Sequence, residues 1–464
     1  MSGEATRPAT DVADVVVVGL GVGGEAVAGA LADAGLDVVG IESRLVGGEC
    51  PYWGCIPSKM MIRAAGLLEE ARRIPGMAGG SSVTPDWAPV AARIRDEATD
   101  SWDDQVAVDR FTGKGGRFVR GRARVLGPRE VEVDGVGRIS ARTGLVIATG
   151  TSPVIPPIPG LENTPFWTNR EAIEAEVLPR SLVILGGGAI GCELGQAYAR
   201  FGVDVTIVDA APRPIPREEP EAGDIVARSL AADGITLCLG RRATRVGHDG
   251  DGFRVDLDDG RAVRAETLLV ATGRRPGVDA DTWQRLGLSG TPGALPVDDR
   301  LRVTDGVWAV GDVTGHGAFT HVATYQADIA VRDILGRPGP EADYRALPRV
   351  TFTDPEVGAV GLTESQAREQ GYRVATGSTP VPSTARGWIH KAGNDGIIKL
   401  VVDADRDTLL GATSAGPAGG EVLGALTVAV HAQVPVSVLE SMIYAYPTFH
   451  RGIQDAIRDL RRGR

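Results

Sequence analysis

The stretch "ADVVVVGLGVGGEAVAGALADAGLDVVGIE", residues 13–42, decides the fold. A run of β-branched residues ends at glycines, an alanine-rich stretch typical of a helix follows, and a second valine-rich run ends on Glu42. Gly19, Gly21 and Gly24 have the G-x-G-x-x-G spacing. In this pattern the first glycine permits a tight turn, the second lets the backbone approach a pyrophosphate, and the third lets the helix pack closely on the strand. Glu42, 18 residues past the last glycine, can accept hydrogen bonds from ribose hydroxyls.

The same arrangement occurs again in residues 180–209, "RSLVILGGGAIGCELGQAYARFGVDVTIVD". Its glycines are Gly186, Gly188 and Gly191, and Asp209 again lies 18 residues past the last one. One such glycine pattern is a weak signal in a chain with 63 glycines. Two copies, each framed by strand, helix, strand and acid at the same offset, predict that the chain binds two dinucleotides.

Further strands frame the two units. "TGLVIATG" (143–150) and "ETLLVATG" (266–273) each predict a strand ending where a dinucleotide lies across the strand ends. "GVWAVGDVTG" (306–315) predicts a buried strand with Asp312 at its C-terminal end. Residues 121–141 alternate polar and apolar side chains between glycines and predict a small antiparallel meander.

The pattern changes after about residue 340. Residues 399–416, "KLVVDADRDTLLGATSAG", predict a hairpin, and residues 421–433 and 435–444 are apolar helical stretches. These elements predict a separate C-terminal α+β domain.

Composition limits the classes of function. A chain of 464 residues predicts more than one domain, and the net charge of -11 argues against non-specific nucleic-acid binding and against an anionic membrane surface. The N-terminal residues 1–18 lack the pattern of a signal peptide, and no apolar run is long enough for a transmembrane helix. Four cysteines are too few for a disulfide scaffold, so we expect a reducing, cytoplasmic compartment.

The stretch "GGECPYWGCIPSK", residues 47–59, contains two cysteines that could be a metal site, a structural disulfide, two inert thiols or a redox pair. A metal needs three or four ligands, and the six histidines are scattered, so we expect no metal. Positions i and i+5 of a regular helix point about 140° apart, so a Cys50–Cys55 bridge needs a distorted backbone. Pro51 and Gly54 can provide that distortion. A strained bridge is readily reduced, as a catalytic disulfide should be.

The chain resembles the class I flavoprotein disulfide reductases, the pyridine nucleotide-disulfide oxidoreductases that include dihydrolipoamide dehydrogenase, glutathione reductase and mercuric reductase. The resemblance is nearly full length and rests on the first glycine motif, the cysteine stretch, "GGGAIGCELG", "ATGRRP", "AVGDVTG" and "TFTDPEVGAVGLTESQA". It implies an α/β fold with two Rossmann-like domains and a C-terminal α+β dimerisation domain, in a homodimer. The implied domains are a discontinuous FAD-binding domain (1–155 and 275–342), an NAD(P)-binding domain (156–274) and a dimerisation domain (343–464).

The resemblance also implies roles for single residues. Cys55 would face the flavin and accept electrons from it, and Cys50 would lie further out and attack the disulfide substrate. Lys59 and Glu193 would form an ion pair beside the flavin, and Asp312 would lie near its ribityl chain. The candidate cofactor-binding residues are Gly19, Gly21, Gly24, Glu42, Gly48, Lys59, Ala123, Thr149, Gly150 and Asp312 for FAD, and Gly186, Gly188, Gly191, Asp209 and Gly273 for the nicotinamide nucleotide.

The residues around Asp209 favour NAD over NADP. Its carboxylate would hydrogen-bond the adenosine 2'-hydroxyl and would repel a 2'-phosphate. The NADPH-using relatives usually have arginines at or just after this point, whereas Ala210 and Ala211 follow here, with Arg213 and Arg217 close by.

The C-terminal stretch "YAYPTFHRG", residues 444–452, departs from the family's His-Pro-Thr-x-x-Glu motif. Tyr446 takes the place of the histidine that exchanges protons with the outer thiol, and Arg451 takes the place of the glutamate. A tyrosine, with a pKa near ~10, is a poor base but can donate a hydrogen bond. If a helix begins at Pro447, His450 would share a face with Tyr446 and could substitute for the missing imidazole.

Other departures bear on the substrate. Gln326 and Ala327 stand where relatives often have Glu and Gly. The mercuric reductases also lack the histidine but use a C-terminal cysteine pair, which this chain does not have, so mercury reduction is disfavoured.

We therefore expect electrons to pass from NADH through FAD to a Cys50–Cys55 disulfide and on to a small disulfide or thiol metabolite. Two alternatives are a quinone reductase or diaphorase that transfers electrons directly from flavin, and a non-catalytic flavoprotein that senses NADH.

Overall fold

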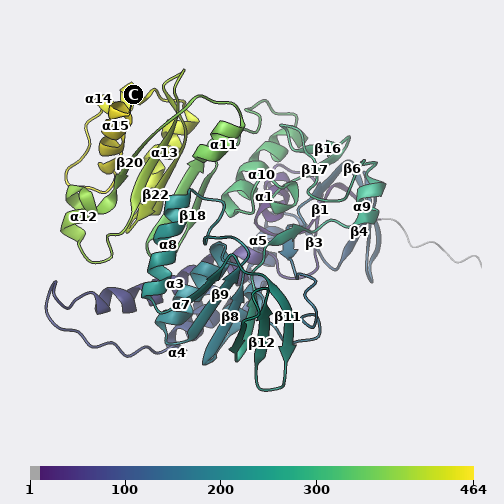
Figure 1. Ribbon diagram of the computed structural model, residues 1–464. Helices are drawn as coiled ribbons and strands as arrows, with labels where there is room; N and C mark the ends of the chain where they lie inside the picture. The colour runs from purple at the N-terminus through teal and green to yellow at the C-terminus, as the bar shows by residue number, and fades with distance from the viewer. Residues whose placement is uncertain (1–10, 464) are drawn as a thin grey trace, which may run out of the picture. The chain divides into compact units, whose positions relative to one another are not determined.

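The computed structural model describes residues 11–463 (Figure 1). Residues 1–10, which carry most of the stretch expected to lack a signal peptide, lie outside the described residues. The chain divides into two compact units. The first consists of the chain up to Pro57 with Arg95–Val154 and Arg274–Asp343, and the second consists of Ser58–Ile94, Ile155–Gly273 and Tyr344–Arg464.

The first unit is built on a sheet in which the order of the main strands is β16-β17-β6-β1-β2-β3. β1 pairs in parallel with β2 and β6, as the valine-rich runs around the first glycine motif predict. The strands are β1 (Asp11–Val18), β2 (Val38–Glu42), β3 (Arg117–Arg120), β6 (Gly137–Ile147), β16 (Arg302–Thr304) and β17 (Val307–Ala309). β4 (Ala123–Gly127) and β5 (Glu130–Val133) form the predicted antiparallel meander with β6.

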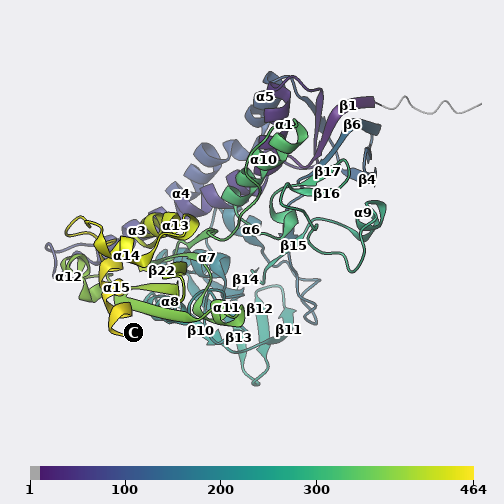
Figure 2. The same ribbon diagram turned by 90° about the horizontal axis from the view of Figure 1, so that it is seen from above.

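Both faces of this sheet are covered. On one face α1 (Val22–Asp33) and α10 (Thr320–Ile334) lie side by side, and α5 (Gln105–Gly113) adds Phe111 to the same core (Figures 1 and 2). On the other face the meander and α9 (Ala280–Arg285) enclose a second core, to which Ile147 and Trp283 belong. The continuous apolar runs of β1 and β6 follow from burial on both faces.

The second unit contains a parallel sheet with the order β10-β9-β8-β14 and an antiparallel sheet with the order β11-β12-β13. Its strands are β8 (Ser181–Leu185), β9 (Asp204–Asp209), β10 (Thr236–Leu239), β11 (Ala243–His248), β12 (Phe253–Leu257), β13 (Ala262–Ala265) and β14 (Thr267–Val270). The helices α6 (Asn169–Glu174), α7 (Ala189–Arg200) and α8 (Pro220–Ala232) belong to the same part of the chain. The second strand-helix-strand prediction is confirmed as β8, α7 and β9.

A five-stranded antiparallel sheet, β18-β19-β22-β21-β20, also belongs to the second unit. Its strands are β18 (Pro348–Thr351), β19 (Glu356–Gly361), β20 (Val374–Pro380), β21 (Ile397–Asp403) and β22 (Thr408–Gly416). Its helices are α11 (Glu364–Glu369), α12 (Ala385–His390), α13 (Gly419–His431), α14 (Val436–Ser441) and α15 (Gly452–Arg462). The β21–β22 pair confirms the predicted hairpin, and α13 and α14 confirm the two predicted helical stretches.

The two compact units do not follow the predicted three-domain boundaries, because residues 58–94 and the C-terminal sheet group with residues 155–273. The three boundaries stay a prediction. Between residues 11 and 463 no helix is long and apolar enough to cross a membrane.

Candidate active site

The two cysteines lie on different helices. Cys50 is in the short helix α2 (Glu49–Trp53), and Cys55 is the first residue of α3 (Cys55–Arg72). Between them Gly54 has φ −130° and ψ −114°, which breaks the helix. This is the backbone distortion that a close pair at positions i and i+5 requires. The structure holds both residues as thiols, and their side chains are hydrogen-bonded to each other.

The surroundings of Cys50 favour its thiol over its thiolate. Its hydrogen bond to Cys55 and its partial burial both raise the pKa of Cys50, and a hydrogen bond to Thr320 opposes the shift. Thr320 is the first residue of α10, and its hydroxyl oxygen lies 3.3 Å from the Cys55 sulfur. Thr320 therefore contacts the side chains of both cysteines.

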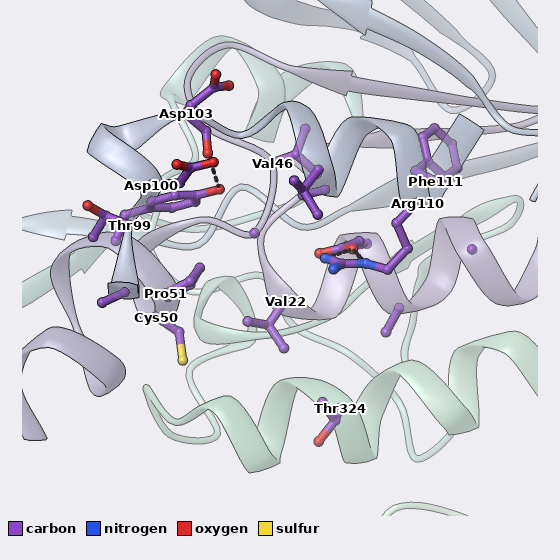
Figure 3. Close-up of a pocket in the computed structure, with 18 of the residues that line it drawn as sticks. Val22, Val46, Cys50, Pro51, Thr99, Asp100, Asp103, Arg110, Phe111 and Thr324 are labelled. Atoms are coloured by element: carbon purple, nitrogen blue, oxygen red, sulfur yellow. Dashed lines mark hydrogen bonds and ion pairs between the residues drawn. The ribbon is translucent and has the colours of Figure 1, made fainter. Parts of the chain in front are cut away.

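A cavity of about 600 Å³ lies in the first unit beside α1, α2 and α5 (Figure 3). Cys50 is one of its lining residues and Cys55 is not. Figure 3 shows the Cys50 sulfur directed into the space near Pro51, Val22 and Thr324. Both thiols are half-buried, and of the two only Cys50 faces this cavity.

The glycines of the first loop divide into packing positions and an open position. A methyl group on Gly19, which has φ +92°, would lie 2.5 Å from the carbonyl oxygen of Ala148, and one on Gly24 would overlap the carbonyl oxygen of Gly19. A methyl group on Gly21, at the N-terminus of α1, would meet nothing nearer than Gly48 Cα at 3.9 Å. This arrangement fits a pyrophosphate in front of the helix N-terminus.

Glu42 is fixed at the end of β2 by the same loop. One carboxylate oxygen accepts the backbone N–H of Leu20 and the other accepts that of Arg44, both at 2.8 Å. Gly48, with φ +71°, closes the loop, because a methyl group on it would lie 2.8 Å from Gly21 Cα. Glu42 and Gly48 therefore belong to one cradle with the first glycine motif.

Asp312 lies just past the end of β17, as predicted, in a helical turn of residues Asp312–Thr314. Its carboxylate accepts the Thr151 hydroxyl at 2.8 Å, and burial raises its pKa. Gln326, fully buried on α10, accepts the backbone N–H of Gly311 at 2.7 Å and donates to the Thr314 hydroxyl at 2.9 Å. One amide thus holds both ends of the turn that carries Asp312.

The other candidate FAD residues of the first unit lie in two places. Thr149 and Gly150 stand between β6 and β7 (Thr151–Pro153), and the Gly150 carbonyl accepts the Gly277 N–H at 2.8 Å. Ala123 begins β4 in the meander. β7 pairs with β15 (Arg274–Pro276), and Arg274 donates to the Thr151 hydroxyl at 2.8 Å.

The second glycine loop repeats the first. A methyl group on Gly186 would overlap the carbonyl oxygen of Ala271, and one on Gly191 would overlap that of Gly186. Gly188, at the N-terminus of α7, has nothing within 4 Å of such a methyl group. The residues of this loop therefore also fit a dinucleotide.

Asp209 at the end of β9 holds the position that Glu42 holds in the first unit. Its carboxylate accepts the backbone N–H of Gly187 at 2.5 Å and that of Ala211 at 2.7 Å. Gly273, with φ +120°, follows β14, the strand that pairs with β8 on the side opposite to β9.

Lys59 and Glu193 form the ion pair that the resemblance implies, with Nζ 2.8 Å from the carboxylate. The Glu193 side chain is only 7% exposed, and its second oxygen accepts the backbone N–H of Phe352 at 2.8 Å. The Lys59 ammonium also stands 4.6 Å from the centre of the Phe352 ring. The cation is therefore held by a carboxylate and an aromatic face together.

The C-terminal stretch corrects one expectation. Helix α15 begins at Gly452, so a helix that starts at Pro447 and places Tyr446 and His450 on one face is wrong. The apolar side chains Ile453 and Ile457 are buried, and packing of that stripe sets where the helix starts. Tyr446 is 68% exposed.

Sequence reasoning missed several residues around the thiols. Arg274 lies in the "ATGRRP" motif but was given no role of its own, and Thr320 is 265 positions away from its partner Cys55. Gln326 was noticed only as a departure from the relatives, although its amide organises the Asp312 turn. The cavity-lining stretch within residues 97–103 carries no periodic signal at all.

Comparison with known proteins identifies the architecture. The family model described as pyridine nucleotide-disulphide oxidoreductase matches residues 13–327, and the model of the family's dimerisation domain matches residues 347–457. The dimerisation domain supports assembly as a homodimer.

Individual relatives agree with the family match. A mercuric reductase from Bacillus cereus is 33% identical over 446 residues, covering 94% of this chain and 70% of the relative. A dihydrolipoyl dehydrogenase from Thermus scotoductus is 32% identical over 467 residues, covering 96% and 97%. The structure of the HOCl-induced flavoprotein disulfide reductase RclA from Escherichia coli, in its Cu(II) complex, has a TM-score of 0.84 at 28% identity, covering 97% and 99%.

These matches favour disulfide chemistry over the quinone-reductase and NADH-sensor alternatives. FAD, when bound, relays electron pairs between a nicotinamide and a thiol pair. Two glycine cradles, each with its acid, and a close cysteine pair fit that cofactor set. The chain belongs to the pyridine nucleotide-disulfide oxidoreductase family, and it is an FAD-dependent, NAD(P)H-driven disulfide oxidoreductase.

Proposed function

We propose that Cys50 and Cys55 are the redox pair, with Cys50 as the thiol that attacks the substrate and Cys55 as the thiol that exchanges electrons with FAD. The observation that carries this division is access, since Cys50 lines the cavity and Cys55 does not. The substrate is a small disulfide that reaches Cys50 through the cavity.

The proposed reaction is a thiol–disulfide exchange in two steps. The Cys50 thiolate attacks one substrate sulfur, a mixed disulfide forms, and the first thiol leaves with a proton. The Cys55 thiolate then attacks the Cys50 sulfur, releases the second thiol and closes the Cys50–Cys55 disulfide. NADH and one proton restore the two thiols, so that NADH, a proton and a disulfide give NAD⁺ and two thiols.

Supporting roles follow from the contacts. Thr320 orients the two sulfurs through its hydroxyl. The Lys59–Glu193 pair keeps a cation fixed for the reduced cofactor. From the family resemblance alone, Tyr446 is the proposed hydrogen-bond donor to the leaving thiol in the position of the family's histidine, and His450 is the alternative proton carrier.

We propose NAD rather than NADP as the nucleotide. The Asp209 carboxylate is held by two backbone N–H groups at the site where the adenosine ribose binds in this fold. Arg213, the nearest downstream arginine, stands 3.9 Å from Asp224 and is drawn toward that carboxylate. A reducing cytoplasm is the proposed compartment, since a close dithiol is kept reduced there.

An anaerobic titration of the FAD-loaded enzyme with NADH tests the redox pair. We expect the wild-type enzyme to accept two electron pairs and the Cys50→Ser and Cys55→Ser variants to accept one. Cys55→Ser should also abolish the long-wavelength absorbance band of the reduced wild-type enzyme. Cys238→Ser, which changes a buried core cysteine, is the matched control and should accept two pairs.

Turnover distinguishes the proposal from direct transfer out of the flavin. Cys50→Ser should lose reduction of bis(2-hydroxyethyl) disulfide with NADH by at least about a thousandfold, as expected for removal of a nucleophile. If Cys50→Ser retains that activity, or if the wild-type enzyme takes up a single electron pair, the assignment of the cysteines is wrong.

A further inference from the structure

The cavity beside Cys50 is lined by apolar side chains, which we call its floor, and by charged side chains, which we call its rim. Val22, Val46, Pro51 and Phe111 supply apolar surface, and Figure 3 shows Pro51 and Val22 close to the Cys50 sulfur. A substrate that presents methylene groups next to its sulfurs is complementary to this floor.

The rim carries more negative than positive charge. Its lining includes four carboxylates (Glu25, Glu97, Asp100 and Asp103) and two cationic side chains (Arg110 and Lys114). The two cations are already engaged by carboxylates. Arg110 donates from Nε to Glu25 at 2.7 Å, and the Lys114 ammonium stands 2.8 Å from Asp33. Neither cation is therefore set up to receive an anionic substrate.

A strained turn contains Asp100, and Asp103 follows it directly. Asp100, Ser101 and Trp102 have φ of 47°, 56° and 59°, so three consecutive non-glycine residues adopt the left-handed conformation. This turn follows a π-helical turn of residues Ile94–Ala98. Strained backbone and π-helical turns concentrate at functional sites. The Asp103 carboxylate just after the turn accepts the backbone N–H of Gln105 at 2.8 Å.

The strained turn is tied to the helix that carries Cys50. The Trp102 indole N–H donates to the carbonyl of Tyr52 at 3.3 Å, and the Tyr52 hydroxyl donates to the carbonyl of Asp103 at 3.5 Å. Burial raises the pKa of Tyr52, and the carboxylates of Asp104 and Glu25 raise it further, which is the effect of a negative field around the cavity.

We infer that the cavity selects small aliphatic disulfides with cationic groups and rejects dianionic disulfides of the same size. This inference rests on the proposed function of Cys50. The substrate sulfurs meet the apolar floor, and their ammonium-bearing ends reach the carboxylates of Asp100 and Asp103. Opposite charges raise the local concentration of such a substrate and its rate of encounter.

Modification of the Cys50 thiol by disulfide-forming reagents measures the electrostatic field at Cys50 without turnover. The FAD-loaded Cys55→Ser enzyme is treated at low ionic strength with methanethiosulfonates that carry a trimethylammonium, a neutral or a sulfonate group. The Cys50 thiolate displaces a sulfinate and forms a mixed disulfide in each case. After correction for each reagent's rate with 2-mercaptoethanol, the cationic reagent should react at least about tenfold faster than the anionic one.

Two variants localise the effect. Asp100→Asn/Asp103→Asn removes two rim charges, and asparagine tolerates the left-handed conformation of position 100. We expect the cationic preference to fall at least about threefold in this variant and the salt dependence to weaken with it. Asp305→Asn is the control, since Asp305 is 99% exposed and is not a lining residue, and it should leave the ratio unchanged.

Turnover of the wild-type enzyme gives a second measurement that needs no Cys55 variant. The kcat/KM should fall in the order cystamine, bis(2-hydroxyethyl) disulfide and 3,3'-dithiodipropionate. Equal or reversed order, or equal rates of Cys50 modification by the cationic and anionic reagents, overturns the charge selection while the redox role of Cys50 stands. Faster modification by the cationic reagent with no turnover of any disulfide overturns the proposed function and leaves the negative field in place.

Discussion

The two glycine loops make the same acid contacts, yet only the first is closed by a second pair of glycines, Gly47 and Gly48, that packs against it. In each, an acid at the end of the second strand accepts one N–H from the residue after the first glycine and one N–H from two residues further along the chain. Glu42 does so with Leu20 and Arg44, and Asp209 does so with Gly187 and Ala211. The shared acid contacts therefore do not distinguish the two sites.

The difference lies at the middle glycine. In the first unit Gly48 approaches Gly21 so closely that a methyl group on it would lie 2.8 Å from Gly21 Cα, and the Gly47 N–H donates to the Leu20 carbonyl at 2.7 Å. In the second unit a methyl group on Gly188 has nothing within 4 Å. We therefore expect the first loop, which runs directly into Cys50, to retain its nucleotide and the second loop to exchange its nucleotide in every turnover.

The largest expected effect comes from Gly48→Ala. The new methyl group clashes with Gly21, and alanine is strained at φ +71°, so we expect the purified protein to lose its FAD and about 1–3 kcal/mol of stability. Flavin absorbance and thermal unfolding report both. Gly35→Ala is the matched control, because Gly35 has φ +89° with nothing within 4 Å of a methyl group. If both variants behave alike, strain and not closure of the loop is responsible.

The pH dependence separates the disulfide half of turnover from the NADH half. The hydrogen bond to Cys55 and burial raise the pKa of Cys50, so its attacking thiolate becomes more abundant as the pH increases toward that raised pKa. The kcat/KM for a disulfide should therefore increase about tenfold per pH unit from roughly pH 6.5 to 9.5, beyond the pKa of an ordinary cysteine. Anaerobic reduction by NADH alone should change far less over this range. A plateau that begins near pH 8.5, the pKa of an ordinary cysteine, would show that the pKa of Cys50 is not raised.

Replacement of the two acids by alanine should affect different nucleotides, FAD in one variant and NADH in the other. Glu42→Ala leaves the N–H groups of Leu20 and Arg44 without their acceptor, at a cost of about 1–3 kcal/mol, and should speed FAD release. Asp209→Ala should retain FAD and raise the KM for NADH about tenfold, a loss of about 1.4 kcal/mol of binding. Dialysis against a flavin-free buffer and steady-state kinetics measure the two effects. FAD loss from Asp209→Ala would contradict the assignment of the loops.

The smallest effect concerns the choice of nucleotide in the open loop. Ala211→Arg places a cation two residues after Asp209 and should raise kcat/KM for NADPH about threefold, as expected for one exposed ion pair. Ala211→Gln has a long side chain without the charge and should leave the NADH to NADPH ratio unchanged. A similar change in both variants would mean that the length of the side chain, and not its charge, alters binding.

The sequence predicts the two loops well because their geometry is local. Glycine spacing, strand ends and the acid positions are encoded within 30 consecutive residues, and the structure confirms the two strand-helix-strand units and the contacts of Glu42 and Asp209 with their loops. The helix break between the cysteines was also predictable, since glycine and proline mark it.

The surroundings of Cys50 could not be predicted in the same way. The left-handed turn of residues 100–102 has an ordinary polar sequence, and its indole contact to Tyr52 spans 50 positions of the chain. A helix that begins at Pro447 fits the preference of proline for a helix start. Burial of Ile453 and Ile457 instead sets the start of α15 at Gly452. Such features depend on tertiary contacts that no local pattern records.

The buried amide of Gln326 has a consequence for the range of pH over which it holds the turn that carries Asp312. It accepts from the Gly311 N–H and donates to the Thr314 hydroxyl at once. A carboxyl group could do both only while it carried a proton, so a glutamate here would couple the turn to acidity. The amide has nothing to titrate, so its two hydrogen bonds to the turn persist in acid and in alkali, and within the turn only the carboxyl of Asp312 responds to pH.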